Sequence, residues 1–392
     1  MYAAPELTCT TFIMEPIVII ISLLLLTAYS VLIIYYRQSW LSIPTFKPKE
    51  RDGYQTKISI IIPARNEELN IADCLNSIVN QSYPKHLFEV LVVDDHSTDN
   101  TAAVIESYKG QNVQLISLKD FIAPNEINSY KKKAIEIAIR QSTGELIITT
   151  DADCIAPPNW LQTIAVFYQQ QKPAFIVMPV AITCTNRFIE IFQSLDFMTL
   201  QGITGASVHK KFHSMCNGAN LAYTKNAFNK AGGFSGIDAI ASGDDMLLMH
   251  KIFKLYPNGI AYLKIKEVVV HTGPVHTIAQ FFNQRIRWAS KADKYDDKRI
   301  IAVLILVYFF NVWIFILGVA AFFFKVGFYF IALIAAKTVI ELFFLYPVAR
   351  FFNKQIILWW FPLAQPFHIL YTITAGWLGK FGSYHWKERR VN

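Results

Sequence analysis

Two carboxylates stand one residue apart at the end of an apolar, strand-like run. The stretch "GELIITTDADC" (144–154) places Asp151 and Asp153 directly after "LIIT". Strand side chains alternate between two faces, so residues i and i+2 point the same way. Two such carboxylates need a positive partner, and their oxygens suit Mg²⁺ or Mn²⁺, which bind phosphates. The spacing indicates a divalent-metal site, although so short a pattern also occurs in capped turns.

Four further polar stretches accompany this pair. "IIIPARNE" (60–67) ends the first strand-like run, and "VVDDHSTDNT" (92–101) ends the second. "KKK" (131–133) opens a helix-like segment. "SGDDMLL" (242–248) and "QRIRW" (284–288) follow later, the last of them just before a long apolar region. In this order, the motifs resemble those of a membrane-bound family 2 glycosyltransferase over residues 57–288. The resemblance implies the GT-A fold, a nucleotide-sugar donor, a divalent metal and inverting transfer of the hexosyltransferase type.

Several residues match donor-binding positions of that family. They are Pro63, Ala64, Asn66, Glu67, Asp94, Asp95, Lys132 and Asp151. Asp95, or its neighbour Asp94, matches the acid that reads the base, and a carboxylate can accept a hydrogen bond from a uracil N–H. This favours a UDP-sugar. The ordinary alternatives for these positions are a strand-end turn and a helix N-cap.

The metal and diphosphate positions are assigned by the same resemblance. Asp151 matches the residue that faces the sugar and ribose, and Asp153 matches the direct metal ligand. Lys132 stands near the position of a family lysine at the diphosphate, but Tyr130 replaces a usual glycine, so a solvated basic face is an equal alternative. His271 is a minor metal-ligand candidate, because imidazole is a secondary choice for Mg²⁺ or Mn²⁺.

The catalytic base and the acceptor side come next. Asp245 matches the base that takes the acceptor hydroxyl proton, and Asp244 beside it would raise the pKa of that base by like-charge repulsion. The alternative is that both acids cap the following helix. The resemblance puts four groups near the acceptor or diphosphate: Gly218, Asn220, Gln284 and the pair Arg287–Trp288. Arg287 and Trp288 are also suited to lipid phosphates and to an interfacial aromatic belt.

The segments between these motifs predict the elements that position them. Short, β-branched runs such as "KISIIIP", "FEVLVVDD" and "AFIVMPV" alternate with helix-like stretches such as "KKKAIEIAIRQ". Nearly continuous apolar strands are buried on both faces, which predicts a mostly parallel, Rossmann-like α/β sheet. Ligands of such sheets bind at the carboxyl ends of the strands, where the acids at 94–95 and 151–153 fall.

Apolar segments at both ends predict transmembrane helices. Residues 17–36 form an uncharged run of spanning length, with basic residues only after it, which favours an anchor over a signal peptide. Residues 300–324 and 326–349 read as two more spans, with Lys337 and Glu341 four residues apart as a structural pair or, as an alternative, part of a substrate path. The Pro-containing segment 356–379 is ambiguous, because "KERR" (387–390) prefers the cytoplasmic side. The helix-like segment 187–202 lies either on the membrane surface or inside the domain.

Composition is consistent with a membrane protein. Of 392 residues, 53% are hydrophobic and 17% are charged, and the net charge is +8. That excess suits cytoplasmic loops and anionic lipids, and no basic motif suggests nucleic acid. Five scattered cysteines argue against a disulfide framework and a zinc site.

We therefore expect four regions: an anchor (1–38), a linker (39–56), a GT-A domain (57–290) and a membrane region with two or three helices (291–392). The predicted activity moves a sugar to a hydroxyl of a lipid-linked or glycan acceptor of the cell envelope, with the catalytic domain on the cytoplasmic side of the plasma membrane. A processive polysaccharide synthase is the alternative within this class. A non-catalytic scaffold or transport subunit is the alternative from another class.

Overall fold

The computed structural model describes residues 6–48, 55–123, 129–211, 215–240, 243–290, 298–381, 384–386 and 389–391. Side chains are described for 15–379 within these ranges. Part of the predicted linker (49–54), Ser242 of "SGDDMLL" and residues 387–388 of "KERR" lie outside the described residues. The chain divides into two compact units: Met1–Leu41 with Ile278–Gly382, and Ser42–Thr277 with Ser383–Asn392.

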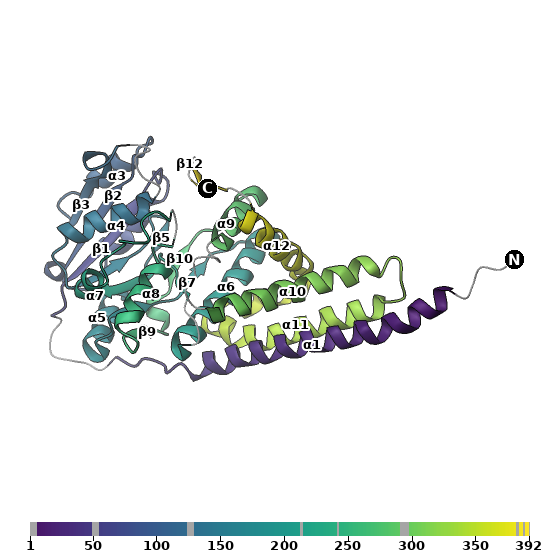
Figure 1. The fold of residues 1–392 in the computed structure, drawn as a ribbon. Coiled ribbons are helices and arrows are strands. Elements are labelled where there is room, and N and C mark those ends of the chain that lie inside the picture. Colours follow the sequence, from purple (N-terminus) through teal and green to yellow (C-terminus); the bar gives the residue numbers. More distant parts are fainter. Residues whose placement is uncertain are drawn as a thin grey trace. The chain divides into compact units, whose positions relative to one another are not determined.

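The second unit is an α/β domain built on a seven-stranded sheet (Figure 1). The strands lie in the order β3-β2-β1-β4-β8-β6-β9. Their bounds are β1 Ile58–Ala64, β2 Phe88–Asp94, β3 Val113–Ser117, β4 Leu146–Thr149, β6 Phe175–Val177, β8 Leu221–Thr224 and β9 Ile260–Tyr262. Only β8 runs antiparallel to its neighbours in this sheet. The mostly parallel α/β fold predicted from the sequence is confirmed.

The central strands are where the apolar runs predicted them. Ile60, Ile61 and Ile62 of β1 are fully buried, as a strand covered on both faces requires. In the register of the sheet, Ala64 at the end of β1 pairs with Asp94 at the end of β2, and Ile61 pairs with Thr149 at the end of β4. The acidic motifs therefore follow the carboxyl ends of neighbouring parallel strands, on the same side of the sheet.

Helices cover this sheet between the strands. They are α2 Ile71–Val79, α3 Thr101–Glu106, α4 Tyr130–Gln141, α5 Trp160–Gln171, α7 Lys225–Lys230 and α8 Met246–Leu255. Helix α4 packs on β1 and β2, α3 packs on β3, and α7 packs on β8. In α4, apolar residues recur at helical spacing on the buried side. Their burial packs the helix on the sheet and so places the lysines of its first turn beside the domain.

A second, three-stranded sheet lies beside the first. It contains β5 Cys154–Ile155, β10 Val270–Thr272 and β7 Val180–Ile182, with β10 in the middle. Helix α6, Phe188–Lys210, packs against β7 and β9. Of the two alternatives for this helix, the packing favours the one inside the domain.

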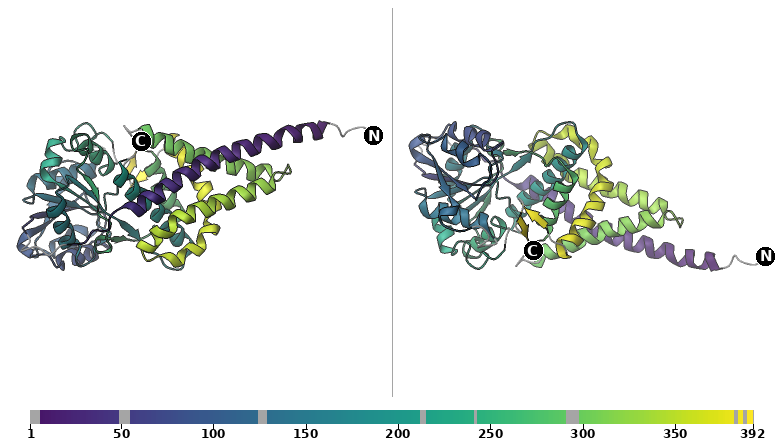
Figure 2. Two further views of the ribbon diagram at one scale, coloured as in Figure 1. Left: turned by 90° about the horizontal axis from the view of Figure 1, so that it is seen from below. Right: turned by 90° about the horizontal axis from the view of Figure 1, so that it is seen from above.

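The first unit is helical. It contains α1 Glu6–Ser42, α9 Ile278–Ala289, α10 Lys298–Ala320, α11 Gly327–Phe351 and α12 Phe361–Phe381, with the short 3₁₀ turn η5 Gln355–Trp360 before α12. Within it, α1 runs alongside α10 and α11 (Figures 1 and 2). Four segments among the described residues are long and apolar enough to cross a membrane: Glu15–Ser42, Lys298–Ala320, Gly327–Phe351 and Gln355–Gly379. The ambiguous Pro-containing segment is one of them.

A buried polar cluster joins three of these helices. Lys337 on α11 donates hydrogen bonds to Glu341 at 2.7 Å and to Gln365 of α12 at 2.8 Å. Tyr29 of α1 donates to the same Glu341 carboxylate. Charges inside an apolar bundle need such partners, and every member of this cluster has one. The geometry therefore agrees with the structural reading of the Lys337–Glu341 pair.

Candidate active site

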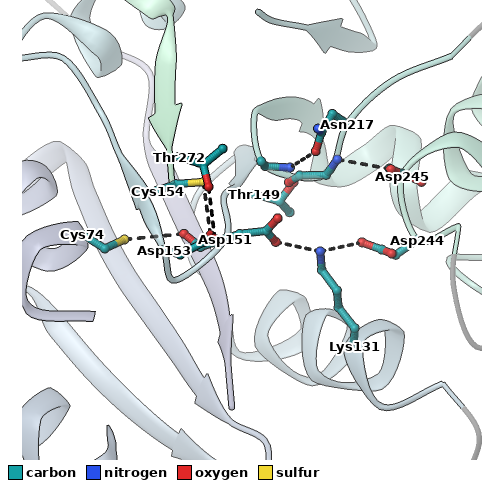
Figure 3. A network of polar contacts seen from close by, with 12 residues as sticks. Cys74, Lys131, Thr149, Asp151, Asp153, Cys154, Asn217, Asp244, Asp245 and Thr272 are labelled. Atoms are coloured by element: carbon teal, nitrogen blue, oxygen red, sulfur yellow. Dashed lines mark hydrogen bonds and ion pairs between the residues drawn. The ribbon is translucent and has the colours of Figure 1, made fainter. Parts of the chain in front are cut away.

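The first acid of the Asp-x-Asp pair has a lysine as its positive partner. Strand β4 ends at Thr149, and Asp151 and Asp153 follow in the turn before β5. The Lys131 ammonium at the start of α4 lies 2.7 Å from Asp151 Oδ1. Figure 3 shows this contact at the centre of a polar network. In the protein alone, Lys131 supplies the charge that the paired carboxylates require.

Lys131 also reaches the acids before α8. Its Nζ lies 3.3 Å from Asp244 Oδ2, so one ammonium bridges two motifs that are far apart in the sequence (Figure 3). Burial lowers the pKa of Lys131, but the Asp151 and Asp244 carboxylates outweigh burial and hold that pKa well above its usual value. Lys131 is therefore a permanent cation at this place, and it offsets the repulsion between Asp244 and its neighbour.

Asp245 is held against the strip that precedes β8. It is the N-cap residue of α8, and its carboxylate accepts the N–H of Met246 at 2.7 Å and the N–H of Gly218 at 3.3 Å. Thr149 at the end of β4 donates to the carbonyl of Gly218 at 3.2 Å. Gly218 therefore links the end of β4, the strand before Asp151, to the base candidate. Helix capping and a chemical role are both compatible with this position of Asp245.

Asp153 points to the second sheet. Its Oδ2 accepts a hydrogen bond from Thr272 Oγ1 of β10 at 3.1 Å. Thr272 was missed by the sequence analysis, because nothing local marks it and only the pairing of β10 with β5 brings it there. His271, the minor metal candidate, is the neighbouring residue of β10, paired with Ile155.

The loops after β1 and β2 are interlocked by side chain to backbone bonds. The Asn66 amide carbonyl accepts the Thr98 N–H at 2.9 Å, and the Glu67 N–H donates to Thr101 Oγ1 at 2.7 Å. Arg65 donates to the carbonyl of Asp95 at 2.8 Å. These bonds fix the ends of the two strands against each other, so the "PARNE" and "DDHST" stretches form one surface.

Both acids of this surface are buried. Asp94 is 6% exposed and Asp95 is 3% exposed. Asp95 contacts His96, whose two ring nitrogens lie 3.0 Å from Asp95 Oδ1 and 3.0 Å from the carbonyl of Ile122. Among the described residues, no hydrogen-bond partner faces Asp94 Oδ1. A buried carboxylate oxygen without a partner is costly, and a ligand N–H would satisfy it.

Two predicted site residues are engaged elsewhere in the domain. Lys132 is 1% exposed, and its amine donates to the carbonyl of Ile237 at 2.6 Å instead of facing the carboxylates. Asn220 is fully buried, accepts from Trp160 Nε1 at 3.0 Å and donates to the carbonyls of Pro179 and Val268, both at 2.8 Å. The position beside the acids belongs to Lys131, and the amide of Asn220 joins three segments of the core.

The residues of "QRIRW" lie on α9, in the helical unit. Gln284, Arg287 and Trp288 share this helix, as their spacing predicted. The guanidinium of Arg285, between them in the sequence, stacks 4.2 Å from the Trp288 ring centroid and 4.8 Å from that of Phe281. Arg285 was not among the predicted site residues. Its cation–π contacts orient the Trp288 side chain within that unit.

The donor set fits a divalent cation that is shared with a substrate. Within the described part of the chain, no group of three or more His, Cys, Asp or Glu side chains is arranged as a metal cage. Asp151 and Asp153 offer carboxylate oxygens, and Mg²⁺ is usually bound by one or two carboxylates together with waters and substrate phosphates. These two residues would therefore hold a metal together with a diphosphate. Cys74 and Cys154 lie behind them as free, buried thiols, and burial raises the pKa of each.

Taken together, the fold and site define an α/β domain whose ligand surface lies at the carboxyl edge of a parallel sheet, the usual place for nucleotides. A family model described as "Glycosyl transferase family group 2" matches residues 146–378, which is more than half of the chain. A second, "Glycosyl transferase family 2", matches residues 59–232. The chain belongs to the family 2 glycosyltransferases. The resemblance inferred from the motifs is confirmed.

Curated relatives share part of their length with this chain. "Probable glycosyltransferase YdaM" of Bacillus subtilis is 27% identical over 305 residues, which is 69% of this chain and 66% of that protein. "Poly(ribitol-phosphate) beta-N-acetylglucosaminyltransferase TarS" of Staphylococcus aureus is 36% identical over 115 residues, 29% of this chain and 19% of that protein. The chain thus matches less than two thirds of the length of either relative.

A solved structure supports the fold. The mannosyltransferase PcManGT from Pyrobaculum calidifontis, in complex with GDP-Man and Mn²⁺, superimposes with a TM-score of 0.55. It is 20% identical and the match covers 89% of this chain and 98% of that one. At this identity the likeness concerns the fold.

Proposed function

We propose that this protein is a membrane-anchored, inverting glycosyltransferase. It moves a sugar from a nucleotide-sugar, of which a UDP-sugar is favoured, to a hydroxyl of a lipid-linked or glycan acceptor. The observation that carries this proposal is the bridge that Lys131 makes between Asp151 and Asp244. It joins the acid motif after β4 to the acid motif before α8, which is the arrangement that donor cleavage and acceptor activation require together.

Asp245 is proposed as the catalytic base. Its carboxylate takes the proton of the acceptor hydroxyl while that oxygen forms a bond to the anomeric carbon of the donor sugar. The bond from that carbon to the diphosphate oxygen breaks, and the electron pair leaves with the nucleoside diphosphate. Asp244 is the less suitable base, because it is paired with Lys131 at 3.3 Å. Its role is to hold that ammonium in the site.

Lys131 is proposed as the diphosphate-facing cation in place of Lys132. Its ammonium already lies between two acids, 2.7 Å from Asp151, and it can move to phosphate oxygens when the donor arrives. A fixed positive charge at the departing diphosphate stabilises the negative charge that develops there. Gly218 allows this approach, because it carries no side chain beside Lys131 and Asp244.

The metal is proposed to be Mg²⁺ or Mn²⁺, held by Asp153 and Asp151. When bound, such an ion acts as a Lewis acid toward the diphosphate oxygens. Thr272 would orient Asp153 from the second sheet through the hydrogen bond to Oδ2. The presence of Mn²⁺ and GDP-Man in the Pyrobaculum mannosyltransferase supports the same chemistry for a protein of this fold.

The base of the donor is proposed to bind on the surface formed by the loops after β1 and β2. Backbone groups of residues 63–67 are proposed to line this surface. Asp94 and Asp95 are proposed to form hydrogen bonds with the edge of the base. The buried Asp94 oxygen that lacks a partner among the described residues would accept a ring N–H. Uracil offers such a group, and so does guanine, so the donor panel below includes both bases.

The membrane unit is proposed to hold the domain at a bilayer with an acceptor nearby. Four segments are suited to spanning. Arg37 lies near the end of the first of them, and Lys47 follows it. By the positive-inside rule this favours a cytoplasmic domain at the plasma membrane. On α9, Gln284, Arg287 and Trp288 are proposed to meet the acceptor or the diphosphate. The proposed organisation is an anchor (1–38), a linker (39–56), a GT-A domain (57–290) and a membrane region (291–392).

The test is a panel of radiolabelled UDP- and GDP-sugars with total membrane lipids, with and without Mn²⁺ and Mg²⁺. The expected result is transfer of one UDP-sugar label into the organic phase or a glycan fraction, lost with a chelator. Asp245→Asn and Asp153→Asn should each abolish transfer while the protein still inserts and folds. Full transfer by both variants would contradict the proposed roles of Asp245 and Asp153.

A further inference from the structure

The second lysine of α4 is buried against a loop. Lys132 is 1% exposed, and its Nζ donates hydrogen bonds to the backbone carbonyls of Ile237 and Ile240, at 2.6 and 2.5 Å. Burying a charged amine is costly unless hydrogen bonds replace its water shell. The backbone at 237–240 therefore folds around the ammonium, and the two carbonyls supply that replacement.

The same loop is held by other side chains that also bind its carbonyls. Ser129, the N-cap residue of α4, donates to the carbonyl of Asp238. Lys251 of α8 donates to the carbonyls of Gly233 and Ser235, at 2.7 and 2.6 Å. Residues 233–240 belong to no helix or strand, so these donors satisfy carbonyls that no ladder satisfies. Ser129 and Lys132 hold its later half, and Lys251 holds its earlier half.

The later half of this loop leads to the proposed catalytic acids. Asp244 and Asp245 follow Ile240 closely in the sequence, and Asp244 contacts Lys131, the neighbour of Lys132 on α4. Consecutive side chains on an α-helix point about 100° apart, so one turn of α4 presents one ammonium to the acids and the other to the loop before them. Helix α4 thus contacts Ile237 and Ile240 through Lys132 and contacts Asp244 through Lys131.

We propose that Lys132 is a positioning residue that fixes the 237–240 loop and thereby places Asp244 and Asp245 against Lys131 and Gly218. The inference rests on the proposed function, because it concerns where the proposed base stands. It differs from the prediction made from the sequence, in which Lys132 binds the donor. A donor-binding lysine would face a ligand, whereas this amine is enclosed by backbone carbonyls.

The experiment compares full-length Lys132→Met with Lys251→Met in the same membrane mimetic. Methionine keeps most of the length of lysine and removes the charged donor group. For Lys132→Met we expect kcat to fall about 100-fold, since a shift near 1 Å of a catalytic group has that effect. Affinity for UDP, measured by calorimetry, should stay within about twofold, because Asp95 contacts His96 and Asp151 contacts Lys131. Lys251→Met should lower kcat much less.

A second variant keeps the proposal testable if Lys132→Met fails to fold. Ser129→Ala removes the hydroxyl that donates to the carbonyl of Asp238 and should lower kcat with unchanged UDP affinity. Unchanged kcat in the folded Lys132 variant would overturn the proposal, and so would parallel loss of kcat and UDP affinity, which would return Lys132 to donor binding. If both variants keep wild-type kcat, the loop does not position the acids.

Limited proteolysis separates this proposal from the proposed function. Thermolysin cleavage at 237–240 should be faster in Lys132→Met than in the wild type and unchanged in Lys131→Met. This measurement needs no sugar transfer. A wild-type protein that binds UDP and transfers nothing would remove the proposed function, while faster cleavage in Lys132→Met alone would still establish that Lys132 holds the loop. Equal cleavage in wild type and Lys132→Met would refute the proposal that Lys132 holds this loop.

Discussion

Gly218 lies so close to Asp244 that a Cβ on Gly218 would stand 3.1 Å from Asp244 Oδ2, and the same atom would stand 3.3 Å from Lys131 Nζ. Both distances are tight for a carbon beside charged atoms. A methyl group at residue 218 would therefore push the Asp244 carboxylate and the Lys131 ammonium aside by a few tenths of an ångström.

Gly218→Ala should separate Lys131 from Asp244 and lower kcat about tenfold or more, because catalytic groups displaced by fractions of an ångström lose transition-state contacts. Steady-state kinetics on the folded variant checks this. Gly273→Ala is the matched control, since a Cβ there meets nothing within 4 Å. Equal kinetics for the two variants would mean that this close approach has no part in catalysis.

The charge of Lys131 sets a pH prediction. Burial lowers the pKa of Lys131 and the carboxylates of Asp151 and Asp244 raise it further than burial lowers it, so it lies above the unfolded value, which is about 10.4. The stabilising pair is then fully present below that pH and is lost only as pH rises through the folded pKa. Between about pH 6 and 9, Lys131→Arg should keep the wild-type shape of the rate profile, and Lys131→Met should lower activity equally at every pH. An alkaline limb that disappears in Lys131→Arg would contradict this.

Thr272→Val should weaken metal binding more than catalysis. The variant removes the hydrogen bond to Asp153 Oδ2, and loss of such a supporting contact typically weakens metal affinity about tenfold. The Mn²⁺ concentration for half-maximal activity measures it, with kcat at saturating Mn²⁺ retained. Thr183→Val serves as the control, because Thr183 Oγ1 donates to the backbone carbonyl of Thr272 and leaves the carboxylate alone. An unchanged Mn²⁺ requirement would exclude Thr272 from the metal site.

Asn220→Ala should destabilise the domain without changing how the folded enzyme meets its acceptor. The variant leaves partners on Trp160, Pro179 and Val268 unsatisfied in the core, which costs roughly 2–4 kcal/mol in the free energy of unfolding. Thermal unfolding in detergent measures the loss. A raised KM for acceptor at normal stability would instead support acceptor contact by Asn220.

In the helical unit, Lys337→Met should leave the Glu341 carboxylate buried without the ammonium that pairs with it. We expect a loss of roughly 2 kcal/mol in stability, with a smaller loss in the double variant Lys337→Met/Glu341→Leu, because a buried charge without its partner is worse than an apolar pair. Thermal unfolding of the wild type, the two single variants and the double variant forms the cycle. Additive losses would show that the two side chains do not act as a pair.

Much of the α/β domain could be predicted from the sequence. The runs that became β1, β2, β3, β4 and β6 are apolar and β-branched, and the α2 and α4 segments have helical periodicity. These patterns act locally, over a few residues, and the sheet's own register then aligns their polar ends. The antiparallel direction of β8 carried no such signal, because a short apolar pattern does not indicate in which direction a strand pairs.

What the residues themselves decided is the type and order of chemistry: the acids at 94–95, 151–153 and 244–245, the apolar spans, and membership of the family. Only the tertiary structure decided which side chains contact the acids. Lys131 and not Lys132 meets the acids, because the rotation of α4 in its packing selects one of two adjacent lysines. Thr272 reaches Asp153, because β10 pairs with β5 across a long sequence separation. Contacts of this kind depend on how elements pack, and packing is set by the whole chain and not by any short stretch of it.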